Sequence, residues 1–318
     1  MKSKYYFYKT KFIYLNTLKE IFETDQYKNI EFIANQVVEG FITGLHRSPY
    51  HGFSVEFAEH RAYNTGENTK FIDWKLFGKT EKLFVKRFEE ETNLRCHIII
   101  DTSSSMLFPF NSDINKLNFS VFSAAALINL FKRQRDAIGL SLFSEELDFH
   151  INSKLSKSQI SLVYSELENC IKKEKQKKNK KTNAAKIINE IAEIVHQRSL
   201  VIIFSDMLVS ENSDKLFDAL QHLRFKQHEI ILFHLRDKQH ELDFDFANRP
   251  YKFIDLETEK EVKLTPTEIG ENIRAKFQEY FNEIKLKSGQ NKIHFIEADI
   301  NQNFNQVLLP YLNNRNKM

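Results

Sequence analysis

A group of oxygen-bearing side chains follows an apolar segment of the chain. Residues 96–108 read CHIIIDTSSSMLF, so the apolar run ends in a carboxylate and continues into hydroxyls, with no lysine in the stretch. Asp101, Ser103 and Ser105 form the pattern D-x-S-x-S, which can turn three oxygens toward one point as the chain leaves a strand. Such a donor set suits Mg²⁺ or Mn²⁺ rather than zinc. Because few dedicated charges are present, we expect the cation to keep waters and an open coordination position.

The elements that must position these oxygens follow from the periodicity after residue 93. Apolar strands alternate with amphipathic helices, which predicts a mostly parallel sheet covered by helices on both faces. Strands are expected at 94–100, 137–144, 147–152, 199–206, 228–235 and 292–299, and helices at 115–134, 160–174, 184–198, 215–225, 266–288 and 303–312. In open sheets of this kind ligands bind beyond the carboxyl ends of the strands. The loops after Ile100 and Ser205 each begin with an aspartate, Asp101 and Asp206.

Two residues distant in sequence complete the predicted site. Asp206 ends a strand that should lie beside the first strand if the strand order switches there. Thr182 opens the helix that follows the lysine-rich run 172–181. We therefore predict that Asp101, Ser103, Ser105, Thr182 and Asp206 together bind the metal.

Simpler roles for the same side chains stay open. Ser103, Ser105 or Thr182 could cap a helix, and Asp206 could accept hydrogen bonds from backbone NH groups of its own turn. The lysine run could be a solvated loop or an electrostatic rim for an acidic partner.

This set of five residues resembles the metal-ion-dependent adhesion site (MIDAS) of von Willebrand factor A domains. Residues from about 94 to 313 are similar to such a domain in the order of their elements as well. The resemblance implies a Rossmann-like, von Willebrand A-like α/β domain that binds an acidic residue of a partner protein through its metal.

The segment before the predicted sheet has a different composition and periodicity. Residues 1–48 are expected to be helical, and residues 46–95 mix short β-like pieces, aromatic residues and charges of both signs. We predict a first domain over 1–92, made of N-terminal helices and a small β-rich unit. The second domain is the α/β domain over 93–318, with a hairpin insertion near 250–264.

The small β-rich unit carries a second resemblance, to the DUF58 family. The similar motifs stand in order before the D-x-S-x-S strand and are Glu56-Phe57, Arg61 and Tyr63, Gly66-Glu67, Ile72-Asp73-Trp74, and Glu89 and Glu91. Glu67 stands where the family usually has Asp, and Thr182 follows a lysine rather than the usual glycine. The resemblance implies an adaptor that works with a MoxR-type AAA+ ATPase.

The chain lacks the sequence motifs of several enzyme classes. The haloacid-dehalogenase phosphatases also place an Asp after an apolar strand, but their second Asp, the general acid, is replaced by Ser103. The chain contains no G-x-S-x-G, P-loop or H-E-x-x-H motif. We expect a protein-binding module rather than an enzyme. A metal-dependent phosphoester hydrolase using Asp101, and a structural scaffold with a vestigial metal site, are the alternatives.

Bulk composition sets broad limits on the class of protein. The net charge of +3 over 318 residues is too small to indicate nucleic-acid binding. No apolar run long enough to span a membrane and no signal peptide stand out, and two cysteines suit a reducing compartment. We expect a cytoplasmic protein with no membrane span.

Overall fold

The computed structural model describes most of the chain from residue 94 onward and shorter pieces before it. The described residues are 17–23, 29–47, 60–62, 74–81, 83–86, 94–110, 112–174, 183–208, 213–243, 249, 251–254, 261–264 and 266–315. By their internal contacts they belong to two compact units, residues 1–43 with 94–318, and residues 44–93.

A six-stranded sheet forms the centre of the larger unit. Its order is β10-β7-β6-β3-β4-β5, with β5 antiparallel to β4 and all other neighbours parallel. The predicted mostly parallel α/β fold is thus confirmed. The strands are β3 (Arg95–Asp101), β4 (Ala137–Phe143), β5 (Leu147–Lys154), β6 (Leu200–Ser205), β7 (Glu229–Arg236) and β10 (His294–Asp299).

The sheet reverses its winding direction beside β3. The chain runs from β3 outward to β4 and β5, then returns to β6 on the other side of β3. The expectation that the strand ending near Asp206 lies beside the first strand is therefore correct. Both strands are buried over nearly their whole length, as their continuous apolar runs require. Their carboxyl ends meet at the switch point, where open α/β sheets bind ligands.

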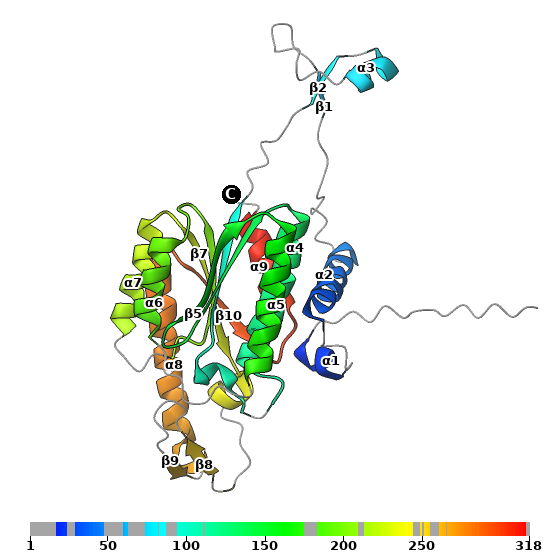
Figure 1. Cartoon of the computed structure of the whole chain (residues 1–318). Coiled ribbons are helices and arrows are strands. Elements are labelled where there is room, and N and C mark those ends of the chain that lie inside the picture. The colour runs from blue at the N-terminus through cyan, green and yellow to red at the C-terminus, as the bar shows by residue number, and fades with distance from the viewer. Residues whose placement is uncertain are drawn as a thin grey trace, which may run out of the picture. The chain divides into compact units, whose positions relative to one another are not determined.

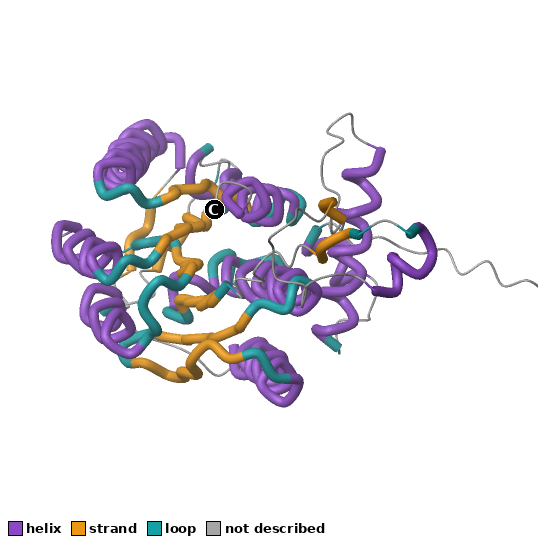
Figure 2. Tube along the Cα trace, turned by 90° about the horizontal axis from the view of Figure 1, so that it is seen from above, coloured by secondary structure: helices purple, strands orange, loops and turns teal. Residues whose placement is uncertain are grey.

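Helices cover both faces of this sheet, as Figures 1 and 2 show, with α6, α7 and α8 on one face and α4, α5 and α9 on the other. The helix α4 is buried from Lys116 to Phe131, because it packs between the sheet and further helices. The helices are α4 (Lys116–Arg133), α5 (Lys157–Glu174), α6 (Ala184–Ile194), α7 (Ser213–Phe225), α8 (Pro266–Gln290) and α9 (Asn305–Arg315), with the short helical turns η2 (Ser104–Leu107) and η3 (Lys238–Leu242).

The N-terminal helices α1 (Leu18–Glu23) and α2 (Ile30–Arg47) pack on the α/β domain. The Asn129 side chain of α4 donates to Asn35 at 2.6 Å, and Lys132 pairs with Glu31 at 2.8 Å. Apolar residues on one side of α2 are buried, as their helical spacing predicts. The structure therefore divides the chain differently from the sequence-based boundary at 92/93, which placed these helices with the β-rich unit.

The described residues of the smaller unit include a two-stranded antiparallel sheet and the helix α3 (Trp74–Thr80). The strands β1 (His60–Ala62) and β2 (Phe84–Lys86) pair, and α3 lies between them in the sequence. Among the family-like residues, Arg61 is in β1 and Trp74 begins α3. The others, which include Glu56, Glu67 and Glu89, lie outside the described residues.

The insertion before α8 is an antiparallel hairpin, as its sequence indicates. It consists of β8 (Tyr251–Ile254) and β9 (Glu261–Leu264). None of the described helices combines the length and the apolar composition that crossing a lipid bilayer requires.

Candidate metal site

Asp101 is the last residue of β3 and is 1% exposed. Its Oδ1 accepts a hydrogen bond from the backbone NH of Ser103 at 2.9 Å, and its Oδ2 accepts one from the Ser205 hydroxyl at 2.8 Å. Ser205 ends the neighbouring strand β6, so the two strands are joined at their carboxyl ends. Both carboxylate oxygens are therefore held in place by the protein.

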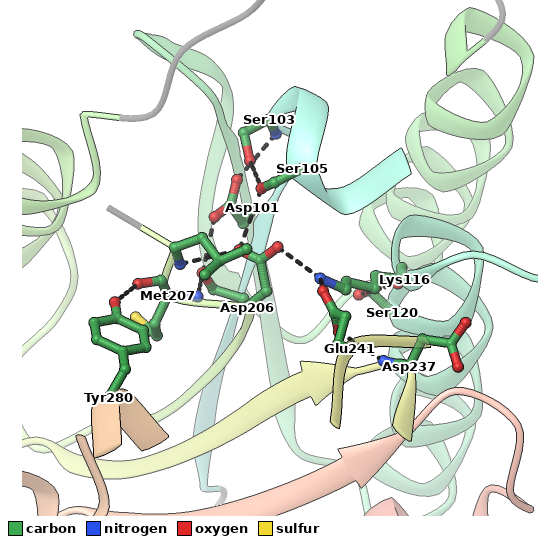
Figure 3. A network of polar contacts seen from close by, with 12 residues as sticks. Asp101, Ser103, Ser105, Lys116, Ser120, Asp206, Met207, Asp237, Glu241 and Tyr280 are labelled. Carbon is green, nitrogen blue, oxygen red and sulfur yellow. Dashed lines mark hydrogen bonds and ion pairs between the residues drawn. The ribbon is translucent and has the colours of Figure 1, made fainter. Parts of the chain in front are cut away.

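The two serines of the D-x-S-x-S pattern connect Asp101 to Asp206 (Figure 3). The Ser103 and Ser105 hydroxyls lie 3.1 Å apart, and Ser105 donates to Asp206 Oδ1 at 3.2 Å. Asp206 is 101 residues away from Ser105 in sequence and is 2% exposed, whereas Ser105 is only partly buried. Four of the five predicted residues thus converge at the switch point, and the group meets solvent at Ser105.

The simpler capping roles are only partly realised. Ser103 is the N-cap of η2, yet its side chain makes no capping hydrogen bond within the described part of the chain. Asp206 does accept from a backbone NH of its own turn, that of Leu208 at 3.2 Å. That bond uses Oδ1, the same oxygen that Ser105 contacts. A turn role for Asp206 explains neither its approach to Ser105 nor the hydroxyl pair.

The fifth predicted residue, Thr182, lies outside the described residues. The next residue, Asn183, is the N-cap of α6, and its backbone NH donates to the Ser144 carbonyl at 3.3 Å. Ser144 directly follows β4, the neighbour of β3 in the sheet.

The donors that converge have the chemistry of a hard-cation site. Mg²⁺ binds oxygens at about 2.1 Å in octahedral geometry, so adjacent ligand oxygens lie roughly 3 Å apart. The Ser103–Ser105 and Ser105–Asp206 oxygen separations of 3.1 and 3.2 Å match that spacing. Within the described residues no three His, Cys, Asp or Glu side chains gather as a metal-binding group. The residues fit a hydroxyl-rich Mg²⁺ or Mn²⁺ site in which Ser103, Ser105 and Asp206 would hold the ion.

A buried lysine touches this group, which sequence reasoning missed. Lys116 is 1% exposed, and its Nζ lies 3.0 Å from Asp206 Oδ2 and 2.5 Å from Glu241 Oε1 (Figure 3). The Phe108 ring centroid lies 5.6 Å from the same nitrogen. The five residues predicted for the site did not include this lysine, although it contacts one of them directly. Lys116 is the second residue of the helix predicted over 115–134, where a lysine looks like an ordinary surface residue, so no local signal marks it.

Glu241 and Asp237 extend the network into η3. The Asp237 side chain accepts from the His240 backbone NH at 3.4 Å, and Glu241 Oε2 accepts from the Asp237 backbone NH at 2.8 Å. This reciprocal pattern resembles a capping box. Glu241 is thereby held by its own turn, with its other oxygen directed to Lys116.

The loop that carries Asp206 is fixed on its other side as well. Tyr280 of α8 donates its hydroxyl hydrogen bond to the Met207 carbonyl, and the Met207 NH donates to the Ser205 hydroxyl at 2.9 Å. Elements β6, α4, η3 and α8 therefore all contribute to the position of Asp206.

Burial and charge determine the protonation states in the site. Burial, and then the charge of Asp206, raise the pKa of Asp101 to about 7. Burial alone would lower the pKa of Lys116, but the carboxylates of Asp206 and Glu241 outweigh it and raise that pKa. Lys116 is therefore an ammonium at neutral pH. The site holds more acidic than basic groups, an excess that a bound cation would neutralise.

Comparison with known families agrees with the resemblance that rests on the motifs from Arg61 to Glu91. The family described as "Protein of unknown function DUF58" matches residues 59–285, well over half of the chain. The chain belongs to the DUF58 family. The match includes the whole D-x-S-x-S segment and Asp206, so the site of this DUF58 protein lies inside the family's shared region.

Two solved structures are similar to this DUF58 protein over 71% of its length and all of their own. One is the conserved hypothetical protein BatB from Bacteroides thetaiotaomicron, at 12% identity and a TM-score of 0.40. The other is an aerotolerance-related membrane protein from Bacteroides fragilis NCTC 9343 with multiple mutations to serines, at 14% identity and a TM-score of 0.38. Similarity at this level carries no argument, and the fold rests on the topology above. No curated protein matches the chain.

Proposed function

We propose that this DUF58 protein is a non-enzymatic binding module of the von Willebrand A type, which engages an acidic residue of a partner protein through a Mg²⁺ or Mn²⁺ ion. The observation that carries the proposal is the unbroken contact path from Asp101 through Ser103 and Ser105 to Asp206. Residues from two adjacent strand ends would be joined by one ion, at the position where open α/β sheets bind ligands.

In this mechanism the protein's own residues orient oxygens and restrict access. Asp101 fixes the Ser103 backbone, and Ser205 fixes Asp101. Ser103, Ser105 and Asp206 then present their oxygens at ligand spacing, and the partly buried Ser105 marks the side open to a partner. A divalent cation held there would offer its free coordination position to a partner's Asp or Glu.

The environment of Asp101 favours binding over hydrolysis. A phosphoester hydrolase would need this carboxylate as nucleophile or base, in reach of substrate. Both of its oxygens instead accept hydrogen bonds inside the protein, and the residue is 1% exposed. A carboxylate held in this way is suited to support ligands rather than to attack a substrate.

A MoxR-type AAA+ ATPase, or its substrate, is the partner we propose, in the cytoplasm. The support for this pairing is the resemblance of the chain to DUF58 and von Willebrand A-like proteins. A pull-down from a lysate with the full chain as bait would test it. We expect the ATPase to be recovered with Mg²⁺ and lost with EDTA, and an equal recovery in both would reject a metal-dependent contact.

A structural role is the second candidate, and Lys116 favours it. Its ammonium already supplies a positive charge to Asp206 and Glu241 at 3.0 and 2.5 Å. A scaffold could use this lysine in place of a metal and bind no divalent ion.

Calorimetric titration with MgCl₂ and MnCl₂ separates the two candidates. The binding module predicts saturable heat with the wild type and none with Asp101→Ala, whose Ser103 loses its anchor. Equal heats from both proteins, or none from either, would reject the metal-dependent function and leave the scaffold.

A further inference from the structure

Lys116 occupies an unusual position beside the candidate metal site. It is the first residue of α4, and its ammonium is buried between a predicted metal ligand, Asp206, and a second acid, Glu241. A buried lysine is costly unless it is paired, so this one has a defined electrostatic role. The role must involve Asp206, because the ammonium contacts one of its two oxygens while Ser105 contacts the other.

We propose that Lys116 is a tethered cation that competes with the divalent ion for Asp206, and that Glu241 is the acid that retains Lys116 when the ion binds. This inference rests on the proposed function and adds a form of regulation to it. The site would then exist in two forms, one in which Lys116 pairs with both acids and one in which the metal holds Asp206.

The first support is charge. An ammonium and a divalent cation on the same carboxylate repel each other, and the repulsion is little screened where the ammonium and the carboxylate are buried. The residues concerned, Lys116 and Asp206, are 1% and 2% exposed. Binding of the metal therefore favours withdrawal of Lys116 from Asp206.

The second support is a cavity into which the Lys116 side chain can move. A cavity of about 30 Å³ adjoins the pair and is lined by Lys116, Asp206, His234, Glu241 and Tyr280 among others. Glu241 holds its position without the lysine, because its Oε2 accepts from the Asp237 NH. The ammonium can therefore leave Asp206 and keep its contact with Glu241.

The test is a double-mutant cycle on the full-length protein, with the Mg²⁺ and Mn²⁺ dissociation constants measured by calorimetry. Lys116→Met removes the competitor and is expected to tighten metal binding about tenfold or more. Glu241→Gln removes the retaining acid, leaves Lys116 on Asp206, and is expected to weaken binding by a similar factor. Lys132→Met, an exposed lysine of the same helix, is the control and should change nothing.

The double variant separates competition from a general effect of nearby charge. If Lys116 competes for Asp206, Glu241→Gln should have no effect once Lys116 is Met. If Glu241→Gln weakens binding by the same factor with and without Lys116, the inference is overturned. Should Lys116→Met not fold, Glu241→Gln alone can still overturn the inference, because unchanged or tighter metal binding contradicts it.

The outcomes also distinguish this inference from the proposed function. Metal binding by the wild type with equal or weaker binding by Lys116→Met would reject competition and leave the proposed function intact. If the wild type binds no metal and Lys116→Met does, the result supports competition and rejects metal binding by the wild-type site. If no variant gives heat of metal binding, both the competition and the proposed function are rejected.

Discussion

The ammonium of Lys116 lies 3.0 Å from Oδ2 of Asp206, a residue 90 positions later in the chain. This pair joins the first residue of α4 to the loop after β6, and Glu241 of η3 completes it. Acids and a base that are distant in sequence are therefore buried together beside the D-x-S-x-S segment. The arrangement has consequences for stability, metal binding and pH response that can be measured separately.

Removing the lysine should destabilise the protein in the absence of metal. Lys116→Met leaves Asp206 and Glu241 buried without their counter-charge, and breaking a buried pair costs roughly 3–5 kcal/mol. Lys132→Met breaks an exposed pair with Glu31 on the same helix and should cost at most about 1 kcal/mol. Urea unfolding in EDTA measures both free energies. Equal losses of unfolding free energy in the two variants would mean that the buried pair stabilises the protein no more than the exposed one.

The hydroxyl of Ser105 should matter for metal binding more than for folding. Ser105→Ala breaks the path between Ser103 and Asp206, and we expect the Mg²⁺ dissociation constant to rise about tenfold, equivalent to about 1.4 kcal/mol. Ser120→Ala is the matched control, since its buried hydroxyl bonds to the Lys116 carbonyl at 2.8 Å within α4. Calorimetry compares the two variants. A similar weakening by both would show that Ser105 is not a ligand.

A glycine should be required at position 139, because the ring of His97 leaves no room for a Cβ there. Gly139 pairs with His97 across β3 and β4, and an added Cβ would overlap His97 Nδ1 and lie 2.8 Å from the Ser153 backbone nitrogen. Gly139→Ala should destabilise the protein by about 1–3 kcal/mol through overpacking. Gly289→Ala in α8, where the added Cβ meets nothing within 4 Å among the described residues, should stabilise it by up to about 1 kcal/mol. Thermal unfolding midpoints that move in the same direction would contradict this pair of predictions.

The same histidine should make the protein sensitive to acid. Burial, and then the charges of His150 and His228, lower the pKa of His97 to about 3 from 6.5. Between these pH values the unfolded chain binds one proton more, so folding weakens as the pH falls from 6.5 toward 3, by about 1.4 kcal/mol per unit. Above 6.5 the effect vanishes.

A His97→Gln variant isolates this effect, because its amide can still donate to the Ser141 hydroxyl that His97 Nε2 contacts at 2.8 Å. Between pH 7.5 and 5.0 the wild type should lose about 2 kcal/mol more unfolding free energy than His97→Gln. Parallel pH profiles for the two proteins in urea unfolding would show that His97 does not titrate as a buried neutral ring.

The sequence by itself predicted the strands and helices of the α/β domain, and it predicted the convergence of Asp101 with Asp206 on the condition that the strand order switches beside β3. Those features depend on local periodicity and on a general rule, that a change of winding direction places two strand ends side by side. The spacing of Ser103 and Ser105 after a strand likewise requires no distant information. The metal role of these residues stays a prediction, and Thr182 lies outside the described residues.

Only the tertiary structure decided which charges meet there. Lys116 and Glu241 are separated by 125 residues and lie in segments whose local patterns are those of an ordinary helix start and an ordinary loop. Their pairing depends on how α4 and η3 pack over the sheet edge, and burial then makes the contact strong. The packing of α1 and α2 on the α/β domain could not be predicted from the sequence either, because it too depends on tertiary contacts. An amphipathic helix reveals that it has a buried face, but its sequence does not name the surface that covers it.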